Sequence, residues 1–236
     1  MDQVRTNARH AGLLYLSLAI IAPFSLSYVP DLLTEAGGVS AATVAANTIL
    51  LRLSLASELL YQVIEVFIVL ALFELFREAQ RKLALQMLVL GLLPIPIVFL
   101  NQLPAFGAIV VATAQGPLAM MAPAPRDAAV VFLYDLHRLG LVLAGIFWGL
   151  WLFPLGRLII ASNFLPSLLG WSVIVGGLGY VLRAIAVLVL PSFLGGEAVH
   201  AFMRASEIMM LGEVPVIAGL LWLGFCKSSD PIAARL

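Results

Sequence analysis

The sequence predicts an all-α, polytopic membrane protein, a six-transmembrane-helix bundle with both termini in the cytoplasm (N-in/C-in). Two observations carry this prediction, the composition and the spacing of the apolar segments. Hydrophobic residues make up 62% of the 236 residues and charged residues only 11%, whereas roughly a quarter of a soluble domain is charged. The mean hydropathy is +1.07. The whole chain, residues 1–236, is expected to form a single transmembrane domain.

Six apolar segments are long enough to be membrane spans. A spanning helix needs about 20 mostly apolar residues. The segments that meet this requirement are residues 8–29, 53–76, 83–106, 128–153, 166–190 and 207–225. We expect each of them to form one transmembrane helix.

Lysines and arginines in the short loops fall mainly on one side of this predicted bundle. Counting them for a chain that starts in the cytoplasm places eight on the side of the N-terminus and three on the other side. The eight are Arg5, Arg9, Arg77, Arg81, Lys82, Arg157, Lys227 and Arg235, and the three are Arg52, Arg126 and Arg204. Short cytoplasmic loops are enriched in these residues, so both termini are expected to be cytoplasmic.

The two longer outer loops differ in the structure they predict. In the first, Ser40 is a suitable N-cap for a short amphipathic helix over residues 41–51 that would lie at the outer surface. In the second, residues 107–127, prolines at 117, 123 and 125 favour an irregular connection.

Six charged residues lie well inside the predicted spans, away from the span ends. An ionised group at membrane depth costs at least a few kcal/mol, so such residues usually face the interior of the bundle, a partner charge or water. The six are Glu58, Glu65, Asp135, Arg138, Arg183 and Glu213. They lie at depths from the outer half of the membrane to its middle, and we expect them to form a charged layer open to the outer side.

Helical spacing predicts which of these residues share a face. Glu58 and Glu65 are seven residues apart, so they lie on one stripe together with Tyr61 and Gln62. Asp135 and Arg138 are three apart, on a face that continues through two glycines, at 145 and 149. Glycines four apart allow a second helix to approach closely, so this face is expected to point into the bundle.

Internal ion pairs would explain part of this charged set. The candidate pairs are Asp135 with Arg138 along one helix, and Glu58 or Glu213 with Arg183 between helices. However, four acids face only two arginines, so at least two carboxylates must be protonated, solvated or bound to a transient partner. The excess of acids is the feature that favours a ligand or proton site over structural pairing alone.

The other polar residues at this depth predict no metal or cofactor site. His137 lies about 200° around the helix from Asp135, and we expect it to be a packing histidine. The amides of Asn101 and Gln102 are expected to bond between helices or to contact a ligand. The single cysteine, Cys226, excludes an internal disulfide. No cofactor and no metal are expected, and a formal net charge of zero does not favour a nucleic-acid partner.

Three segments carry a resemblance to a known family. They are residues 147–170, FWGLWLFPLGRLIIASNFLPSLLG, residues 176–182, GGLGYVL, and residues 11–15, AGLLY. The chain resembles a large bacterial family catalogued as domain of unknown function 4386. The resemblance implies coverage of nearly the whole chain and a multi-pass location in the bacterial cytoplasmic (inner) membrane. It implies no activity, cofactor or site residue.

The acid excess favours a membrane protein that binds or transports a small cationic or amphipathic ligand, with possible coupling to protons. Glu65, the deepest acid, is the predicted proton-linked residue. The predicted ligand- or proton-binding residues are Glu58, Tyr61, Gln62, Glu65, Asp135, Arg138, Arg183 and Glu213. Two alternatives to this non-enzymatic function stay open: first an intramembrane enzyme acting on a lipid or quinone, and then a membrane sensor or scaffold. The expected partners are the lipid bilayer and a small-molecule or lipid ligand; the oligomeric state is not predicted.

Overall fold

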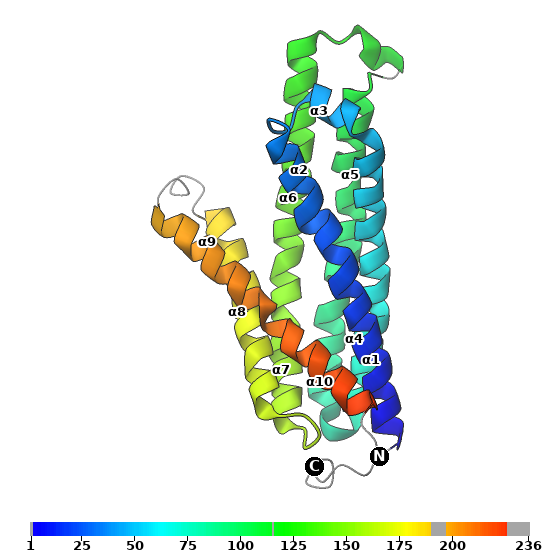
Figure 1. Cartoon of the computed structure of the whole chain (residues 1–236), viewed down its shortest axis with the longest axis vertical. Helices are drawn as coiled ribbons and strands as arrows, with labels where there is room; N and C mark the ends of the chain where they lie inside the picture. Colours follow the sequence, from blue (N-terminus) through cyan, green and yellow to red (C-terminus); the bar gives the residue numbers. More distant parts are fainter. Residues whose placement is uncertain (1, 115, 190–196, 226–236) are drawn as a thin grey trace. The chain divides into compact units, whose positions relative to one another are not determined.

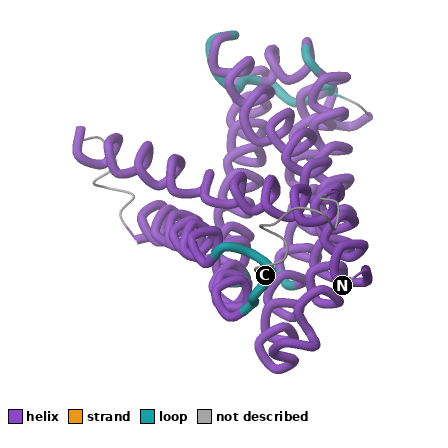
Figure 2. The backbone as a smooth tube through the Cα atoms, turned by 60° about the horizontal axis from the view of Figure 1, so that its bottom comes forward, coloured by secondary structure: helices purple, strands orange, loops and turns teal. Residues whose placement is uncertain are grey.

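The protein is almost entirely helical in the part that the computed structural model describes, residues 2–114, 116–189 and 197–225. Within these residues Figure 2 shows helices joined by short loops and no strand. Five helical stretches are long and apolar enough to cross a membrane: Asp2–Glu35, Thr48–Ala112, Pro123–Ala161, Ser167–Val189 and Ala201–Phe225. The all-α prediction is therefore confirmed for the described residues, whereas the count of six spans and their orientation stay predictions.

The first stretch begins earlier and ends later than predicted. Helix α1, Asp2–Pro23, continues through a π-helical segment, Phe24–Tyr28, into α2, Val29–Glu35. The π-helical segment directly follows Pro23, which has no N–H to donate to the helix. A local change in the helical hydrogen-bond pattern is a common result of such a position.

The short helix of the first loop forms as its sequence predicts, but it is shorter. Helix α3 spans Ala41–Ala46, and the Ser40 side chain accepts a hydrogen bond from the backbone N–H of Thr43. The Thr43 hydroxyl accepts one in return from the Ser40 N–H, at 2.9 Å. This reciprocal capping box satisfies two backbone donors that would otherwise have no partner.

Helix α4, Thr48–Leu92, contains a sharp reversal at Gln80, whose φ of −149° and ψ of 81° are not helical. A Cβ on Gly91 would lie 2.8 Å from a methyl carbon of Val69, although 22 residues of straight helix would separate them by about 33 Å. The two arms of α4 therefore pack against each other. The reversal falls between the predicted segments 53–76 and 83–106, and α5, Pro94–Ala112, completes the second of them.

The second loop is shorter than predicted. A 3-10 turn spans Gly116–Met120, and α6, Pro123–Leu150, already begins at the second of the three loop prolines. Proline is well suited to the first turn of a helix, because the N–H that it lacks would have no partner there. Prolines 123 and 125 therefore start a helix rather than an irregular segment.

The C-terminal half consists of α7, Leu152–Ala161, α8, Ser167–Val189, α9, Glu197–Met210, and α10, Val214–Phe225, with a 3-10 turn, Leu211–Glu213, between the last two. Helices α7 and α8 lie side by side (Figure 1). They touch at Gly156 and Gly170, where a Cβ on either residue would lie 2.5 Å from the carbonyl oxygen of the other. Glycine is needed at both positions for this approach.

Two compact units divide the chain. Unit 1 comprises Met1–Ser17, Ile64–Ile95 and Val142–Leu236, and unit 2 comprises Leu18–Val63 and Pro96–Leu141. Helices α1, α4, α5 and α6 each contribute residues to both. The prediction of a single domain over residues 1–236 is not tested by this division.

Unit 2 has its own apolar core. Side chains from α2, α3, α4, α5 and α6 meet in it; its most deeply buried members are Val29, Leu33, Val44, Ala108, Ile109 and Val130.

Large apolar side chains cover the outer surface of the helices. Four of them, Ile20, Leu100, Leu103 and Phe132, are 65–69% exposed. A soluble protein rarely exposes large contiguous apolar patches, whereas a helix in lipid satisfies its backbone internally and turns such side chains outward. These surfaces are compatible with an integral membrane protein.

Candidate functional site

The predicted site residues divide between the two units. Glu58, Tyr61, Gln62, Asp135 and Arg138 belong to unit 2, and Glu65, Arg183 and Glu213 belong to unit 1. Each unit contains a buried carboxylate with polar neighbours. The two groups are described separately.

The carboxylate of unit 2 is Glu58 on α4, which is 2% exposed. One of its oxygens lies 3.4 Å from Nε2 of His137 on α6, and the other accepts a hydrogen bond of 3.0 Å from Nε2 of Gln102 on α5. Asn101, beside Gln102, contacts the opposite edge of the same imidazole. We call these four side chains, Glu58, Asn101, Gln102 and His137, the Glu58 group.

The His137 ring can gain or lose a proton without losing a hydrogen-bond partner. Its Nδ1 lies 2.9 Å from the carbonyl oxygen of Asn101 and 3.1 Å from the Asn101 side-chain nitrogen Nδ2. Nδ2 itself donates to the His137 carbonyl at 2.8 Å, which sets the orientation of the amide. A neutral ring can therefore accept from Nδ2, and a charged ring can donate to the carbonyl. In both states Nε2–H faces Glu58.

Gln102 leaves one polar atom of the Glu58 group without a partner. Its Nε2 donates both to Glu58 and to the carbonyl of Val98, at 3.2 Å. Reversing the amide would turn its oxygen toward two acceptors, so the observed orientation is the favourable one. Oε1 is buried and has no hydrogen-bond partner among the described residues, and a buried acceptor of this kind costs free energy.

Tyr61 and Gln62, which follow Glu58 on α4, are also buried, at 3% and 0% exposure. Asp135 and Arg138 are not. They form the predicted pair, with 3.8 Å between Arg138 Nη1 and Asp135 Oδ1, but their side chains are 63% and 70% exposed. The expectation that this face of α6 points inward is therefore wrong within unit 2.

The reason lies at Gly140. A Cβ at this position would overlap the side-chain amide of Asn101, so α6 turns Gly140 toward α5. His137 lies three residues earlier and shares this face, which leaves Asp135 on the opposite side of the helix. His137, which was expected to be a packing residue, contacts Glu58, whereas Asp135 and Arg138, which were expected at the site, lie at the surface.

Unit 1 contains two carboxylates, Glu65 on α4 and Glu213 in the turn before α10. The hydroxyl of Tyr15 on α1 donates a hydrogen bond to Glu213, and the hydroxyl of Tyr180 on α8 also hydrogen-bonds to it. The indole N–H of Trp148 on α6 donates to Glu65 at 3.3 Å. We call these five residues, Tyr15, Glu65, Trp148, Tyr180 and Glu213, the Glu213 group.

Aromatic rings surround these carboxylates. The ring centroids of Trp148 and Tyr180 are 6.4 Å apart in an edge-on arrangement, and those of Tyr15 and Trp151 are 6.3 Å apart. Tyr15, Glu65 and Trp151 are at most 4% exposed, and Glu213 is partly buried. The polar partners of both acids are thus carried on large apolar rings.

Close helix contacts place the rings of unit 1. A Cβ on Gly149 of α6 would lie 2.6 Å from the carbonyl oxygen of Gly177 on α8. Trp148 and Tyr180 lie within three residues of this contact. A second contact, in which a Cβ on Gly179 would lie 2.7 Å from the Ser206 carbonyl oxygen, joins α8 to α9.

Arg183 has a different partner from either of those predicted. Its guanidinium lies 2.5 Å from a carboxylate oxygen of Glu207 on α9. Glu213 forms no ion pair with a Lys, Arg or His of the described chain, because its partners are the two tyrosines. The prediction that Arg183 pairs with Glu58 or Glu213 is therefore wrong.

Six residues of these groups were not among the predicted site residues: Tyr15, Asn101, Gln102, His137, Trp148 and Tyr180. Asn101 and Gln102 were expected to bond between helices or to contact a ligand, and His137 was expected to be a packing residue. Tyr15, Trp148 and Tyr180 appeared only in the family motifs. Their sequence signal is weak: Tyr15 follows Ala8 and Ala11 on one helical face, and only the burial of this face, which the structure shows, sets it apart. Among the described residues, no three His, Cys, Asp or Glu side chains lie close enough together to hold a metal ion.

Apolar helices of spanning length, an apolar outer surface and buried carboxylates are together typical of multi-pass membrane proteins. The model of the family described as domain of unknown function (DUF4386) matches residues 10–225, and this chain belongs to that family. No curated protein and no solved structure matches the chain.

Proposed function

We propose that this protein binds, and carries across a membrane, a small cationic or amphipathic ligand, and that it exchanges protons as it does so. The observation that supports the proposal most directly is the Glu213 group. It combines two carboxylates with the rings of Tyr15, Trp148 and Tyr180.

Carboxylates and aromatic faces together are suited to an organic cation. The carboxylate attracts the charge, and an aromatic face within about 6 Å adds a cation–π interaction of roughly 0.5–2 kcal/mol. The partners of Glu213 are neutral hydroxyls, not cations. A ligand cation could therefore supply the positive charge that Glu213 lacks, while the rings contact its apolar part.

The Glu58 group supports the proposed exchange of protons. His137 has hydrogen-bond partners for both its neutral and its charged form, and it faces a buried carboxylate. Intramembrane Glu and His side chains act as proton relays in pumps and transporters. We propose Glu65, the acid of the Glu213 group that lies seven residues from Glu58 on α4, as the place where a proton and the cation compete.

Ligand binding by purified protein tests the proposal. Tetraphenylphosphonium, an amphipathic organic cation, serves as the probe in equilibrium dialysis. We expect Glu213→Gln and Glu65→Gln to weaken binding on the order of tenfold, the loss of about 1.4 kcal/mol. Glu35→Gln removes the same charge from an exposed site at the end of α2 and should bind as the unaltered protein does.

The number of protons released on probe binding tests the proposed proton exchange separately from ligand binding. Adding the probe to protein in weakly buffered solution should release protons, and Glu65→Gln should reduce the number released. Equal binding by all variants would refute the ligand site, and binding without proton release would refute the exchange.

A second function is favoured by the Glu58–His137 contact. A carboxylate facing an imidazole is a common arrangement for general acid–base catalysis, so an intramembrane enzyme that acts on a lipid or quinone is the alternative. His137→Gln would then change the lipid or quinone composition of cells that express the protein, while Glu213→Gln would leave probe binding unchanged. We further propose, from the family, that the protein resides in a bacterial cytoplasmic membrane.

A further inference from the structure

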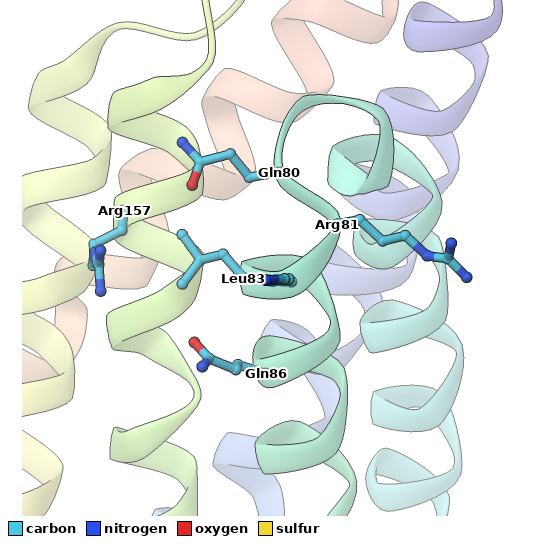
Figure 3. A pocket seen from close by; sticks show the side chains of 6 residues that line it. Gln80, Arg81, Leu83, Gln86 and Arg157 are labelled. Atoms are coloured by element: carbon cyan, nitrogen blue, oxygen red, sulfur yellow. The ribbon is translucent and has the colours of Figure 1, made fainter.

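A cavity with basic residues around it lies in unit 1, between α7 and the part of α4 that follows the reversal at Gln80. Its volume is about 510 Å³, and its lining residues are Gln80, Arg81, Lys82, Leu83, Gln86 and Arg157. Figure 3 shows Gln80, Leu83 and Gln86 extending from α4 toward the helix that carries Arg157, whereas Arg81 points away from it. The cavity therefore presents two amides and a leucine toward α7, with the cations Arg81, Lys82 and Arg157 around it.

The cations of this cavity form no ion pair within the described chain. The acids on the same end of α4 are engaged elsewhere: Arg77 lies 3.1 Å from Glu74 and 3.7 Å from Glu78. Lys82 and Arg157 are exposed, and no described carboxylate lies within ion-pair distance of either. Three positive charges at one cavity, with amides that can donate hydrogen bonds, are the chemistry that recognises a phosphate group.

The surface next to the cavity is apolar and favours a lipid over a soluble phosphate. Leu85 and Val89 are three and seven residues beyond Lys82, so they continue its helical face, and they are 51% and 52% exposed. A molecule whose phosphate contacts Lys82 could therefore lay an acyl chain along this face. Such a molecule has a charged head and an apolar tail.

We propose that this cavity binds the phosphate-bearing head group of an anionic phospholipid. Lys82 and Arg157 contact the phosphate, Gln80 and Gln86 donate hydrogen bonds to it, and Arg81 strengthens the local positive potential. Basic pockets between membrane helices bind anionic lipid head groups in this way, preferentially on the cytoplasmic side. The site lies on the side that the distribution of lysines and arginines predicts to be cytoplasmic. The proposal does not depend on the proposed ligand or proton exchange.

Native mass spectrometry of purified protein in detergent tests this site. The probes are phosphatidylglycerol, phosphatidylcholine and inorganic phosphate. We expect phosphatidylglycerol to bind more tightly than phosphatidylcholine, and Lys82→Gln with Arg157→Gln to weaken it on the order of tenfold or more. Arg52→Gln, which removes an exposed arginine from unit 2, is the matched control and should leave binding unchanged.

A third variant distinguishes a loss of lipid binding from a folding defect. Gln86→Glu keeps the size of an exposed side chain but places a carboxylate in the cavity, so it should weaken phosphatidylglycerol binding while the protein keeps its elution volume and helical content. Unchanged binding in both the double variant and Gln86→Glu would overturn the proposal. Binding of inorganic phosphate as tight as that of phosphatidylglycerol would overturn the assignment to a lipid, because the acyl chains would then contribute nothing.

Discussion

The Glu58 group and the Glu213 group contain the same acidic residue type in very different surroundings. Glu58 contacts nitrogen atoms, from His137 and Gln102. Glu213 contacts phenolic hydroxyls, and Glu65 contacts an indole N–H. Because Glu58 and Glu65 are seven residues apart on one helix, the difference does not come from α4 itself. It comes from the helices that each unit packs against it.

This difference divides the proposed chemistry between the two groups. An imidazole beside a carboxylate offers a second place for a proton, so the Glu58 group is suited to proton exchange. Tyrosine and tryptophan offer neutral donors and π faces, so the Glu213 group is suited to a ligand cation. Substitutions that act on one group and spare the other are the direct way to test this division.

The largest effect is expected for His137→Leu. Removing one partner of a buried pair typically costs about 3–5 kcal/mol, because here the Glu58 carboxylate would stay buried without the imidazole that it faces. The free energy of unfolding in mixed micelles measures this loss. The double variant with Glu58→Leu should recover part of it, and probe binding at the Glu213 group should survive in protein that still folds. Additive losses would show that the two side chains do not interact.

Tyr15→Phe is expected to have the next largest effect. It removes one hydroxyl that donates to Glu213, and a hydrogen bond to a charged group contributes about 1.5–3 kcal/mol. Tetraphenylphosphonium binding should change, since the carboxylate loses a neutral partner while the ring stays. Tyr28→Phe, at an exposed tyrosine in the π-helical segment, is the control and should change neither stability nor binding.

Two glycines provide a paired test of smaller size. Gly140→Ala would push against Asn101, and Gly149→Ala would push against the backbone at Gly177. Overpacking of this kind costs about 1–3 kcal/mol. We expect the second variant to weaken probe binding at the Glu213 group and the first to leave that binding unchanged. The same response from both variants would contradict the division.

The smallest effect is expected for Asp135→Asn. This residue and Arg138 form an exposed pair, and such pairs contribute about 0–1 kcal/mol. Thermal unfolding in detergent should shift by no more than a few degrees, and probe binding should not change. A large loss of binding would restore Asp135 to the candidate site and would imply that this face of α6 is covered in the working protein.

Local sequence patterns predicted the local features of the structure well. Ser40 caps α3 as expected, the helical segments contain the apolar runs, and Asp135 pairs with Arg138 three residues away. The contacts between distant residues were not predicted. Tyr15 and Glu213 are 198 positions apart, and no periodicity within one helix indicates which residue of another helix will meet it.

Most of the wrong predictions about site residues concern which face of a helix is turned toward its neighbours. The pair of glycines at 145 and 149 predicted an inward face for Asp135, but close packing at Gly140 turns His137 inward instead. Arg183 was expected to meet Glu58 or Glu213, but the contact of α8 with α9 brings it to Glu207. In α6 the close contact at Gly140 decides the facing, and in α8 the contact of Gly179 with α9 brings Arg183 to Glu207; in each case the partner lies on another helix.

The amino-acid sequence by itself determined that this chain is helical and apolar enough for a membrane, and that the interiors of its apolar segments carry more acids than arginines. These properties depend on composition and on periodicities of three to seven residues, which a single helix expresses. Only the tertiary structure decided which acids face an imidazole, which face aromatic rings and which lie exposed. These contacts depend on how closely two helices can approach each other. That distance is set by the surface shapes of both helices, so the sequence of one helix alone does not determine it.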